Sequence, residues 1–286
     1  MSENLLSPVV RYHLVTKHNH HRYARGPGYM DWDNQPDPFR NYSGAPVVQL
    51  PVILEDDSPP YRKIFSSDPI ASSPINAKTI SRFLELSLAI SAWKQAGDSR
   101  WALRSNPSSG NLHPTEGYLI LSALEGIHSA SGIYHYLPKD HGLERRLELT
   151  EVDWLDLMKE FPGNSFLAGL TSIHWREAWK YGERAFRYCQ HDIGHALAAY
   201  RIAAAVLGWN LVVLEAMDDH SLSRLFGLDQ DSKLPDAERE HPDLLTIVFS
   251  GSSISEIPMD LNREVIERIA SATWRGIPNR LSQEHV

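Results

Sequence analysis

The sequence is poor in cysteine, in long apolar runs and in positive charge, and each shortage excludes a class of protein. Cys189 is the only cysteine among 286 residues, so no disulfide can form within the chain, and we expect a cytoplasmic protein. The N-terminus has no basic stretch followed by an apolar one, which argues against a secretory signal peptide. In the longest apolar stretch the charge-free part covers only residues 202–214, fewer than the ~18 residues that span a membrane.

The charge balance is acidic. The chain has 28 Lys and Arg against 36 Asp and Glu, a formal net charge of −8. Such a surface offers few cations to phosphate groups, so we expect neither nucleic acid nor a membrane as a partner. Apolar residues make up 42% and charged residues 22% of the chain, which is ordinary for a globular protein and predicts one large or two small domains.

Residues 1–75 differ in composition from the rest. Nine of the 18 prolines lie between Pro27 and Pro74. The segment also holds four histidines, all before Pro27, and scattered aromatic residues. Proline fixes φ and disfavours helix in the residue before it, so this segment is predicted to be extended or irregular. Its aromatic residues predict an arm, residues 1–75, that packs over a surface of the folded domain, residues 76–286.

From residue 76 onward the hydrophobic pattern becomes periodic. Helical periods and helix-start signals predict helices over residues 76–97, 150–161, 175–207, 221–226 and 261–271. Buried or alternating apolar runs predict strands over residues 117–123, 133–137, 143–149, 210–214 and 244–249. Helices and strands do not alternate strictly, so the predicted fold class is α+β, with helices covering a largely antiparallel sheet.

The segment between the first predicted helix and the first predicted strand is rich in polar groups. Residues 104–116 read R-S-N-P-S-S-G-N-L-H-P-T-E, in which two prolines stiffen the chain and Gly110 permits a tight turn. Ser108, Ser109, Asn111 and His113 can donate and accept hydrogen bonds, and Arg104 adds a planar fork of donors. A polar surface turn has the same composition, so the residues alone leave both a ligand-binding loop and a plain turn open.

Three stretches resemble one family. Residues 104–118 resemble the signature R-x-x-P-S-x-G-x-x-x-P-x-E-x-Y of the SagB-type dehydrogenases, which belong to the FMN-dependent nitroreductase superfamily. W-K-Y-G-E-R-A-F-R-Y at 179–188, D-I-G-H at 192–195 and A-V-L-G-W at 205–209 are similar to a second block of that family. Y-H-L-V-T-K at 12–17 is a weaker match to its N-terminal pattern. The matches occur in the family's order, from about residue 10 to about residue 275.

The resemblance implies a three-layer nitroreductase fold with a central sheet, and a long core helix at a dimer interface. It implies FMN bound non-covalently between two such units, with Arg104 facing the N1/O2 region of the flavin or its phosphate, where positive charge favours reduced flavin. The implied flavin contacts are Arg104, Pro107, Ser108, Ser109, Gly110, Asn111, His113, Leu207 and Gly208.

The resemblance also implies an activity. Lys180 and Tyr181 correspond to the Lys-Tyr pair that peptide azoline dehydrogenases of this family use for catalysis. In such a reaction Lys180 would accept a carbon-bound proton while a hydride passes to the flavin, and Tyr181 would orient the amine or relay the proton. The implied protein is an FMN-dependent oxidoreductase acting on an azoline-like or other small-molecule or peptide substrate, with residues 230–240 as a candidate lid of the pocket.

The sequence departs from the family at one point. No Arg-rich R-R-S-x-R-x-[FY] run is present to hold the FMN phosphate, which leaves Arg22, Arg25, Arg82 and Arg100 as candidates. The ends of the chain look like the first half of larger proteins with two nitroreductase-like domains. The partner unit is therefore expected to be a second copy, in a homodimer, or a second nitroreductase-like domain.

Two other functions stay open. The chain could keep the scaffold as a non-catalytic flavin-binding or interaction subunit. A remote alternative is a zinc hydrolase, because His191 and His195 lie four residues apart on one helical face, as in H-E-x-x-H proteases. Asp192 stands where such proteases have glutamate, and Gly194 is unfavourable within a catalytic helix.

Overall fold

A computed structural model describes residues 7–55, 58–66, 68–231, 234, 237–251 and 256–285. Its centre is a seven-stranded sheet in the order β2-β7-β6-β5-β8-β10-β9, in which every neighbouring pair is antiparallel. The strands are β2 (Val47–Gln49), β5 (Thr115–Leu121), β6 (Gly132–Leu137), β7 (Gly142–Glu148), β8 (Ser165–Ser172), β9 (Trp209–Val213) and β10 (His241–Ser250).

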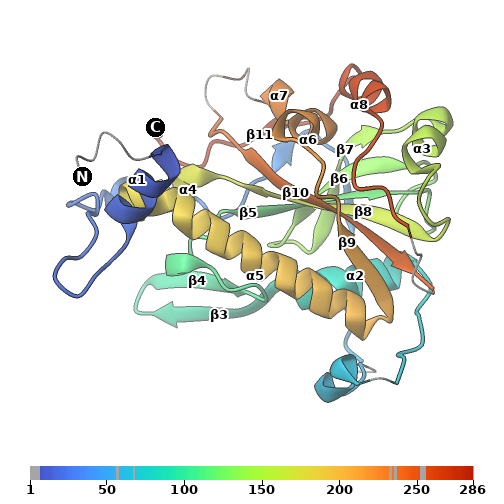
Figure 1. Cartoon of the computed structure of the whole chain (residues 1–286), viewed down its shortest axis with the longest axis horizontal. Coiled ribbons are helices and arrows are strands. Elements are labelled where there is room, and N and C mark those ends of the chain that lie inside the picture. Colours follow the sequence, from blue (N-terminus) through green and yellow to red (C-terminus); the bar gives the residue numbers. More distant parts are fainter. Residues whose placement is uncertain are drawn as a thin grey trace.

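Helices cover both faces of this sheet (Figure 1). On one face α2 (Ala77–Ser87) and α5 (Ala185–Val206) enclose one apolar core against β5, β6 and β8. On the other face α3 (Glu151–Met158), α6 (Asp219–Phe226) and α8 (Arg263–Ala270) enclose a second core. The predicted three-layer α+β fold with a largely antiparallel sheet is therefore confirmed. No helix in the described ranges is both long enough and apolar enough to cross a membrane.

The helix predicted over residues 76–97 is wrong beyond Ser87. The chain instead forms a hairpin of β3 (Ile90–Ala96) and β4 (Ser99–Arg104), which Figure 1 shows below α5. Gly97 takes φ +58 in the turn of this hairpin, a conformation that suits glycine. Most of the hairpin is exposed. Its sequence therefore lacks the alternation of apolar and polar residues that would have predicted two strands.

The helix predicted over residues 175–207 is broken. It consists of α4 (His174–Tyr181), a 3-10 turn over Gly182–Arg184, and α5. Gly182 ends α4 with φ +54 and ψ −127, a conformation that L side chains rarely adopt. The break turns α4 relative to α5 and so determines where the residues at the end of α4 point.

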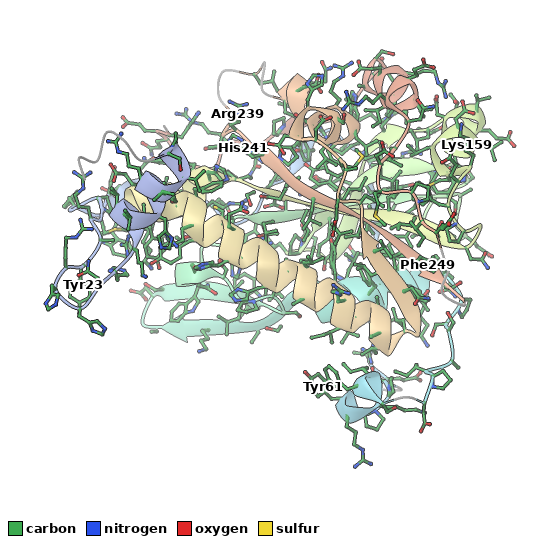
Figure 2. The ribbon with its side chains drawn as sticks, viewed as in Figure 1. Tyr23, Tyr61, Lys159, Arg239, His241 and Phe249 are labelled. Atoms are coloured by element: carbon green, nitrogen blue, oxygen red, sulfur yellow. The ribbon has the colours of Figure 1, made fainter. Side chains whose placement is uncertain are left out.

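The proline-rich arm packs along the domain. It contributes β2 to the sheet edge, and β1 (Tyr42–Ser43) pairs with β11 (Ile277–Pro278). Its helix α1 (Pro8–Thr16) lies beside α4 (Figure 1), while Tyr23 and Tyr61 extend away from the sheet (Figure 2). The remaining short helices are Trp32–Asn34, Tyr61–Phe65, Ser109–Asn111 and α7 (Leu228–Asp231).

Candidate active site

The polar loop that follows β4 is held in a strained shape by its own side chains. Gly110, Asn111 and His113 have φ of +63, +61 and +51, and such values are uncommon for residues other than glycine. The Asn111 side chain donates to the carbonyl of Ala102 at 2.6 Å, and the His113 amide donates to Ser108 Oγ at 2.8 Å. Backbone strain held in this way occurs most often at functional sites.

The D-I-G-H block of α5, residues 192–195, is hydrogen-bonded to the same loop. The backbone amide of Ser109 donates to both carboxylate oxygens of Asp192, at 3.0 and 3.1 Å, and Ser109 Oγ donates to Oδ1 at 3.1 Å. His195 Nδ1 lies 3.2 Å from the carbonyl oxygen of Pro107. Two motifs that are about 80 residues apart in the sequence are therefore in direct contact.

Lys180 and Tyr181 meet this loop at Gly110. A Cβ atom built on Gly110 would lie 2.5 Å from the hydroxyl oxygen of Tyr181 and 3.0 Å from Nζ of Lys180. Both side chains are half-buried, and Gly110 itself is exposed. Gly110 takes φ +63, which favours glycine, and its lack of a Cβ lets the ends of Tyr181 and Lys180 approach the backbone. The predicted cofactor loop and the predicted catalytic pair are therefore in contact.

Two of the expected flavin contacts turn away from this surface. Arg104 is buried and donates to the backbone carbonyls of Thr115 at 2.9 Å and Pro38 at 2.7 Å, and burial lowers its pKa to about 10. His113 is also buried, with Nε2 3.1 Å from the Ala102 carbonyl, and burial followed by the charge of Arg104 lowers its pKa to about 3. Both residues support the loop from inside, and the guanidinium of Arg104 donates to carbonyls of the chain itself.

Leu207 and Gly208 lie at the opposite end of α5 from the loop. Val206, which precedes them, is 14 residues beyond Asp192 on this helix, a separation of about 21 Å. Leu207 is buried, and a Cβ on Gly208 would lie 2.6 Å from the backbone oxygen of Ala71. One copy of the chain therefore does not bring these two residues to the Ser108–Ser109 side of the site.

A buried row of charges joins α4 to the sheet, and sequence reasoning missed most of it. Arg176 of α4 donates to Glu116 of β5 and, at 2.8 Å, to the His113 carbonyl. His135 of β6 lies 2.9 Å from Glu116 and 2.9 Å from Glu144 of β7. Glu116 belongs to the P-x-E-x-Y pattern, but no signal in the sequence pointed to Arg176 or His135.

Positive and negative side chains alternate along this buried row, and each shifts the pKa of its neighbours. Burial alone would raise the pKa of Glu116, but the charge of Arg176 and the hydrogen bond with His135 lower it to about 2. Burial alone would lower the pKa of His135, but its hydrogen bonds with Glu116 and Glu144 raise it to about 9. Arg176 precedes Lys180 by one helical turn, so this row fixes the helix that carries Lys180.

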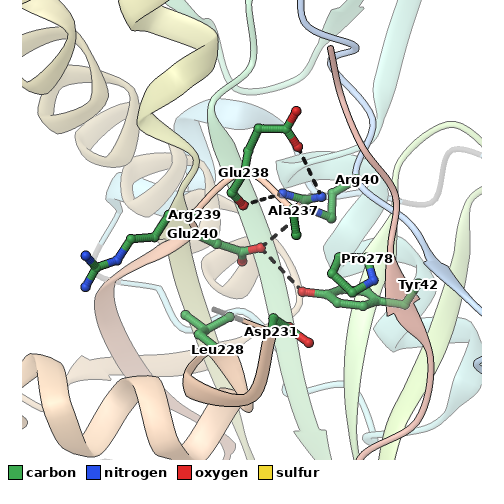
Figure 3. A pocket seen from close by; sticks show the side chains of 9 residues that line it. All are labelled: Arg40, Tyr42, Leu228, Asp231, Ala237, Glu238, Arg239, Glu240 and Pro278. Atoms are coloured by element: carbon green, nitrogen blue, oxygen red, sulfur yellow. Dashed lines mark hydrogen bonds and ion pairs between the residues drawn. The ribbon is translucent and has the colours of Figure 1, made fainter. Parts of the chain in front are cut away.

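The candidate lid is only partly described, because residues 232, 233, 235 and 236 of the segment 230–240 lie outside the described residues. Figure 3 shows Glu238 and Glu240 of this segment beside Arg40, which pairs with them at 3.7 Å and 3.9 Å. The hollow between these residues and Tyr42 measures about 10 Å³, room for about one water molecule. The described residues of this segment hold structure together, and this hollow is too small for a substrate.

Comparison with known proteins identifies the fold family. The profile of the nitroreductase family matches residues 71–235, more than half of the chain. The chain belongs to the nitroreductase family. Proteins of this family are generally FMN-dependent oxidoreductases and usually dimers.

Three similar proteins each match only part of this chain or only part of their own length. A Methanocaldococcus jannaschii protein named as a nitroreductase is 23% identical over 163 residues, 56% of this chain and 78% of that protein. The trifolitoxin-processing protein TfxB of Rhizobium leguminosarum bv. trifolii is 32% identical over 115 residues, 36% of this chain and 29% of TfxB. A solved structure from Anabaena variabilis, also named as a nitroreductase, has a TM-score of 0.62 and 18% identity, covering 92% of this chain and 54% of that one. This chain thus spans about half the length of that structure.

The site of this nitroreductase-family chain fits the ring of a flavin at one side. Pro107 and Gly110 form the exposed rim of a loop with a fixed backbone, and the missing Cβ of Gly110 lets the Lys180 amine and the Tyr181 hydroxyl approach this rim. Each candidate for the phosphate has another partner: Arg22 the Leu14 carbonyl, Arg25 Glu183, Arg82 Glu85, and Arg100 the ring of Trp93.

The zinc interpretation gains no support from the described part of the chain. No group of three or more His, Cys, Asp or Glu there is arranged to hold a metal ion. Asp192, which would have to activate water, is buried and accepts three hydrogen bonds from Ser109.

Proposed function

We propose that this chain is an FMN-dependent dehydrogenase of the SagB type, which oxidises azoline rings in a peptide or a related small molecule. The observation that carries this proposal is the junction at Gly110. There the P-S-S-G-N loop, expected to hold flavin, touches Lys180 and Tyr181, expected to move a proton. A plain surface turn and an unrelated solvated lysine would not be expected to meet at a glycine in the left-handed region.

The similarity to TfxB supports the substrate class. TfxB is named for processing trifolitoxin, and the shared segment is 32% identical over 36% of this chain. The match covers only 29% of TfxB. The peptide substrate is therefore proposed from the residues of the site, with the similarity as support.

Each residue of the junction has a chemical task. FMN, when bound, accepts the hydride that leaves the azoline ring carbon. The amine of Lys180 accepts the proton from the neighbouring ring carbon, so the ring loses one hydride and one proton and becomes aromatic. Burial, followed by the charges of Glu177 and Tyr188, raises the pKa of Tyr181. Its hydroxyl therefore keeps its proton and can donate a hydrogen bond to the amine or the substrate.

A second nitroreductase unit completes the site in this proposal. The exposed side of α5 includes Gln190, Gly194, Ala198 and Ile202, and its small residues allow another helix to approach closely. A partner unit packed antiparallel along α5 would bring its own Leu207–Gly208 end near the Ser108–Ser109 loop. We therefore propose a homodimer, or a pair with a second nitroreductase-like domain, that binds FMN between its units.

Replacement of Lys180 tests the proposal. The FMN-loaded protein is mixed anaerobically with a synthetic peptide that carries one thiazoline, and loss of the oxidised flavin absorbance is followed. Lys180→Ala is expected to retain FMN and to reduce it at least about 100-fold more slowly, because general base catalysis contributes roughly 10²–10⁴-fold. The matched control is Lys159→Ala, an exposed lysine that follows α3, and it should behave like the wild type.

Two results would count against this function. Reduction of Lys180→Ala at the wild-type rate would show that Lys180 is not the base. Retained FMN that neither the thiazoline peptide nor NADH reduces in the wild type would favour the non-catalytic scaffold.

A further inference from the structure

The carboxyl group of Glu177 lies on α4, one helical turn before Lys180 and Tyr181, and it takes no part in the proposed reaction. Glu177 precedes Lys180 by three residues and Tyr181 by four on α4, a spacing that places the three side chains on one side of the helix. Its side chain is fully buried, and neither carboxyl oxygen has a hydrogen-bond partner. A buried carboxylate without donors is strongly unfavourable, so such a group either takes up a proton or pairs with a cation.

The nearby carboxyl group of Asp192 has the opposite surroundings. Burial raises the pKa of Asp192, but Asp192 accepts hydrogen bonds from the amide and the hydroxyl of Ser109, and these donors oppose that shift and favour its charged form. Burial, followed by the charge of Asp192, raises the pKa of Glu177 to about 9, against the smaller opposite effect of Lys180. When two interacting carboxyl groups differ in this way, the one with fewer donors keeps the proton.

Charge interactions link Glu177 to groups on two helices. Lys180 and Tyr181 belong to α4, while Cys189 and Asp192 belong to α5. Cys189 is buried, and burial followed by the charges of Glu177 and Asp243 raises its pKa, so it remains a neutral thiol. Lys180 is therefore the one cation among these four groups.

We propose that Glu177 is a positioning residue that holds a proton, and that its neutral carboxyl leaves the Lys180 side chain free to lie at the Gly110 junction instead of pairing with Glu177. An ionised Glu177 would attract Lys180 into a buried ion pair and draw its side chain away from the junction. A neutral carboxyl fills the same space without that attraction. The inference rests on the proposed function, because it assigns Glu177 a task through Lys180.

The experiment compares Glu177→Ala, Glu177→Gln and the matched control Glu183→Gln in the FMN-loaded protein. Glu183 lies in the 3-10 turn after α4, and its exposed side chain pairs with Arg25. The first readout is the infrared carbonyl band of a protonated carboxylic acid at pH 7. This band should be present in the wild type and Glu183→Gln and absent in both Glu177 variants.

The second readout is the pH profile of flavin reduction by the thiazoline peptide. Glu177→Ala should slow reduction about tenfold or more, because an unfilled space lets Lys180 move, and the neutral, equally sized Gln should restore most of the loss. The wild-type rate should fall as the pH rises through about 9, while in Glu177→Gln this fall should move to higher pH.

The inference is overturned if no infrared band depends on Glu177, or if Glu177→Gln is as slow as Glu177→Ala. It is also overturned if the wild type and Glu177→Gln share one alkaline limb. If the wild type itself fails to reduce its flavin with this peptide, the proposed function fails, and the infrared band still decides whether Glu177 holds a proton.

Discussion

The buried row Arg176–Glu116–His135–Glu144 gives the sharpest prediction about stability. In Glu116→Gln one carboxylate is replaced by an amide of the same shape, which leaves Arg176 and His135 facing a neutral group. Glu116 and Arg176 are fully buried, so solvent cannot replace the lost partner. We expect the variant to fold with reduced stability and with a loosened start of α4.

The magnitude follows from the interactions of Glu116 with its two partners. Lowering its pKa from 4.5 to about 2 corresponds to on the order of 3 kcal/mol of interaction with the charged form. Breaking one side of a buried ion pair typically destabilises a protein by about 3–5 kcal/mol. Both routes predict that Glu116→Gln lowers the free energy of unfolding by about 3 kcal/mol.

The pH dependence has a definite sign. The pKa of Glu116 is lowered on folding, so its contribution is present above pH 4.5 and is lost as the pH falls toward 2. The pKa of His135 is raised on folding, so its contribution is complete below pH 6.5 and is lost as the pH rises through about 9. The difference between wild type and variant should therefore be largest between pH 4.5 and 6.5.

Urea unfolding measured from pH 3 to pH 9 by circular dichroism checks this prediction. Glu148→Gln is the matched control, because Glu148 is half-exposed and pairs with Arg145 on the same strand, β7, and an exposed pair contributes only about 0–1 kcal/mol. The reasoning is refuted if Glu116→Gln costs no more than this control, or if its effect does not change with pH.

Two glycine substitutions test the packing that shapes the site. Gly110→Ala places a Cβ 2.5 Å from the Tyr181 hydroxyl at φ +63, so we expect weaker FMN retention, measured by fluorescence titration, and a loss of about 1–2 kcal/mol in unfolding free energy; unchanged affinity would contradict the junction. Gly208→Ala places a Cβ 2.6 Å from the Ala71 carbonyl at φ +67, so Tm should fall by an amount equivalent to about 2 kcal/mol or more. Gly163, where a Cβ would meet nothing within 4 Å, is the control for both, and a similar Tm for Gly163→Ala and Gly208→Ala would show that the contact is absent.

The elements that could be predicted are those with a clear period or cap. Strands near 133–137 and 143–149 and the helix that begins after Thr150 match the structure, where Thr150 Oγ accepts from the Asp153 amide. Strand β8 was missed because all eight of its residues are buried, so no alternation of apolar and polar residues marks it. The break at Gly182 depends on one backbone conformation, which the helical pattern on either side conceals.

The site was predictable as two parts and not as a whole. The polar loop at 107–113 and the Lys180–Tyr181 pair each had a motif, but their contact at Gly110 arises only from folding. The position of Arg104 could not be predicted, because the sequence does not distinguish a buried arginine that binds backbone carbonyls from one that binds a ligand. Glu177 had no signal in the sequence, since a glutamate in the first turn of a helix is ordinary.

The most direct test of the account is the visible absorption spectrum of the purified protein, recorded before and after FMN is added and the sample is desalted. We predict that flavin bands remain after desalting and that Gly110→Ala retains less flavin than Gly163→Ala. A wild-type protein that retains no flavin after this treatment would contradict the claim that the loop at 107–111 forms part of an FMN site.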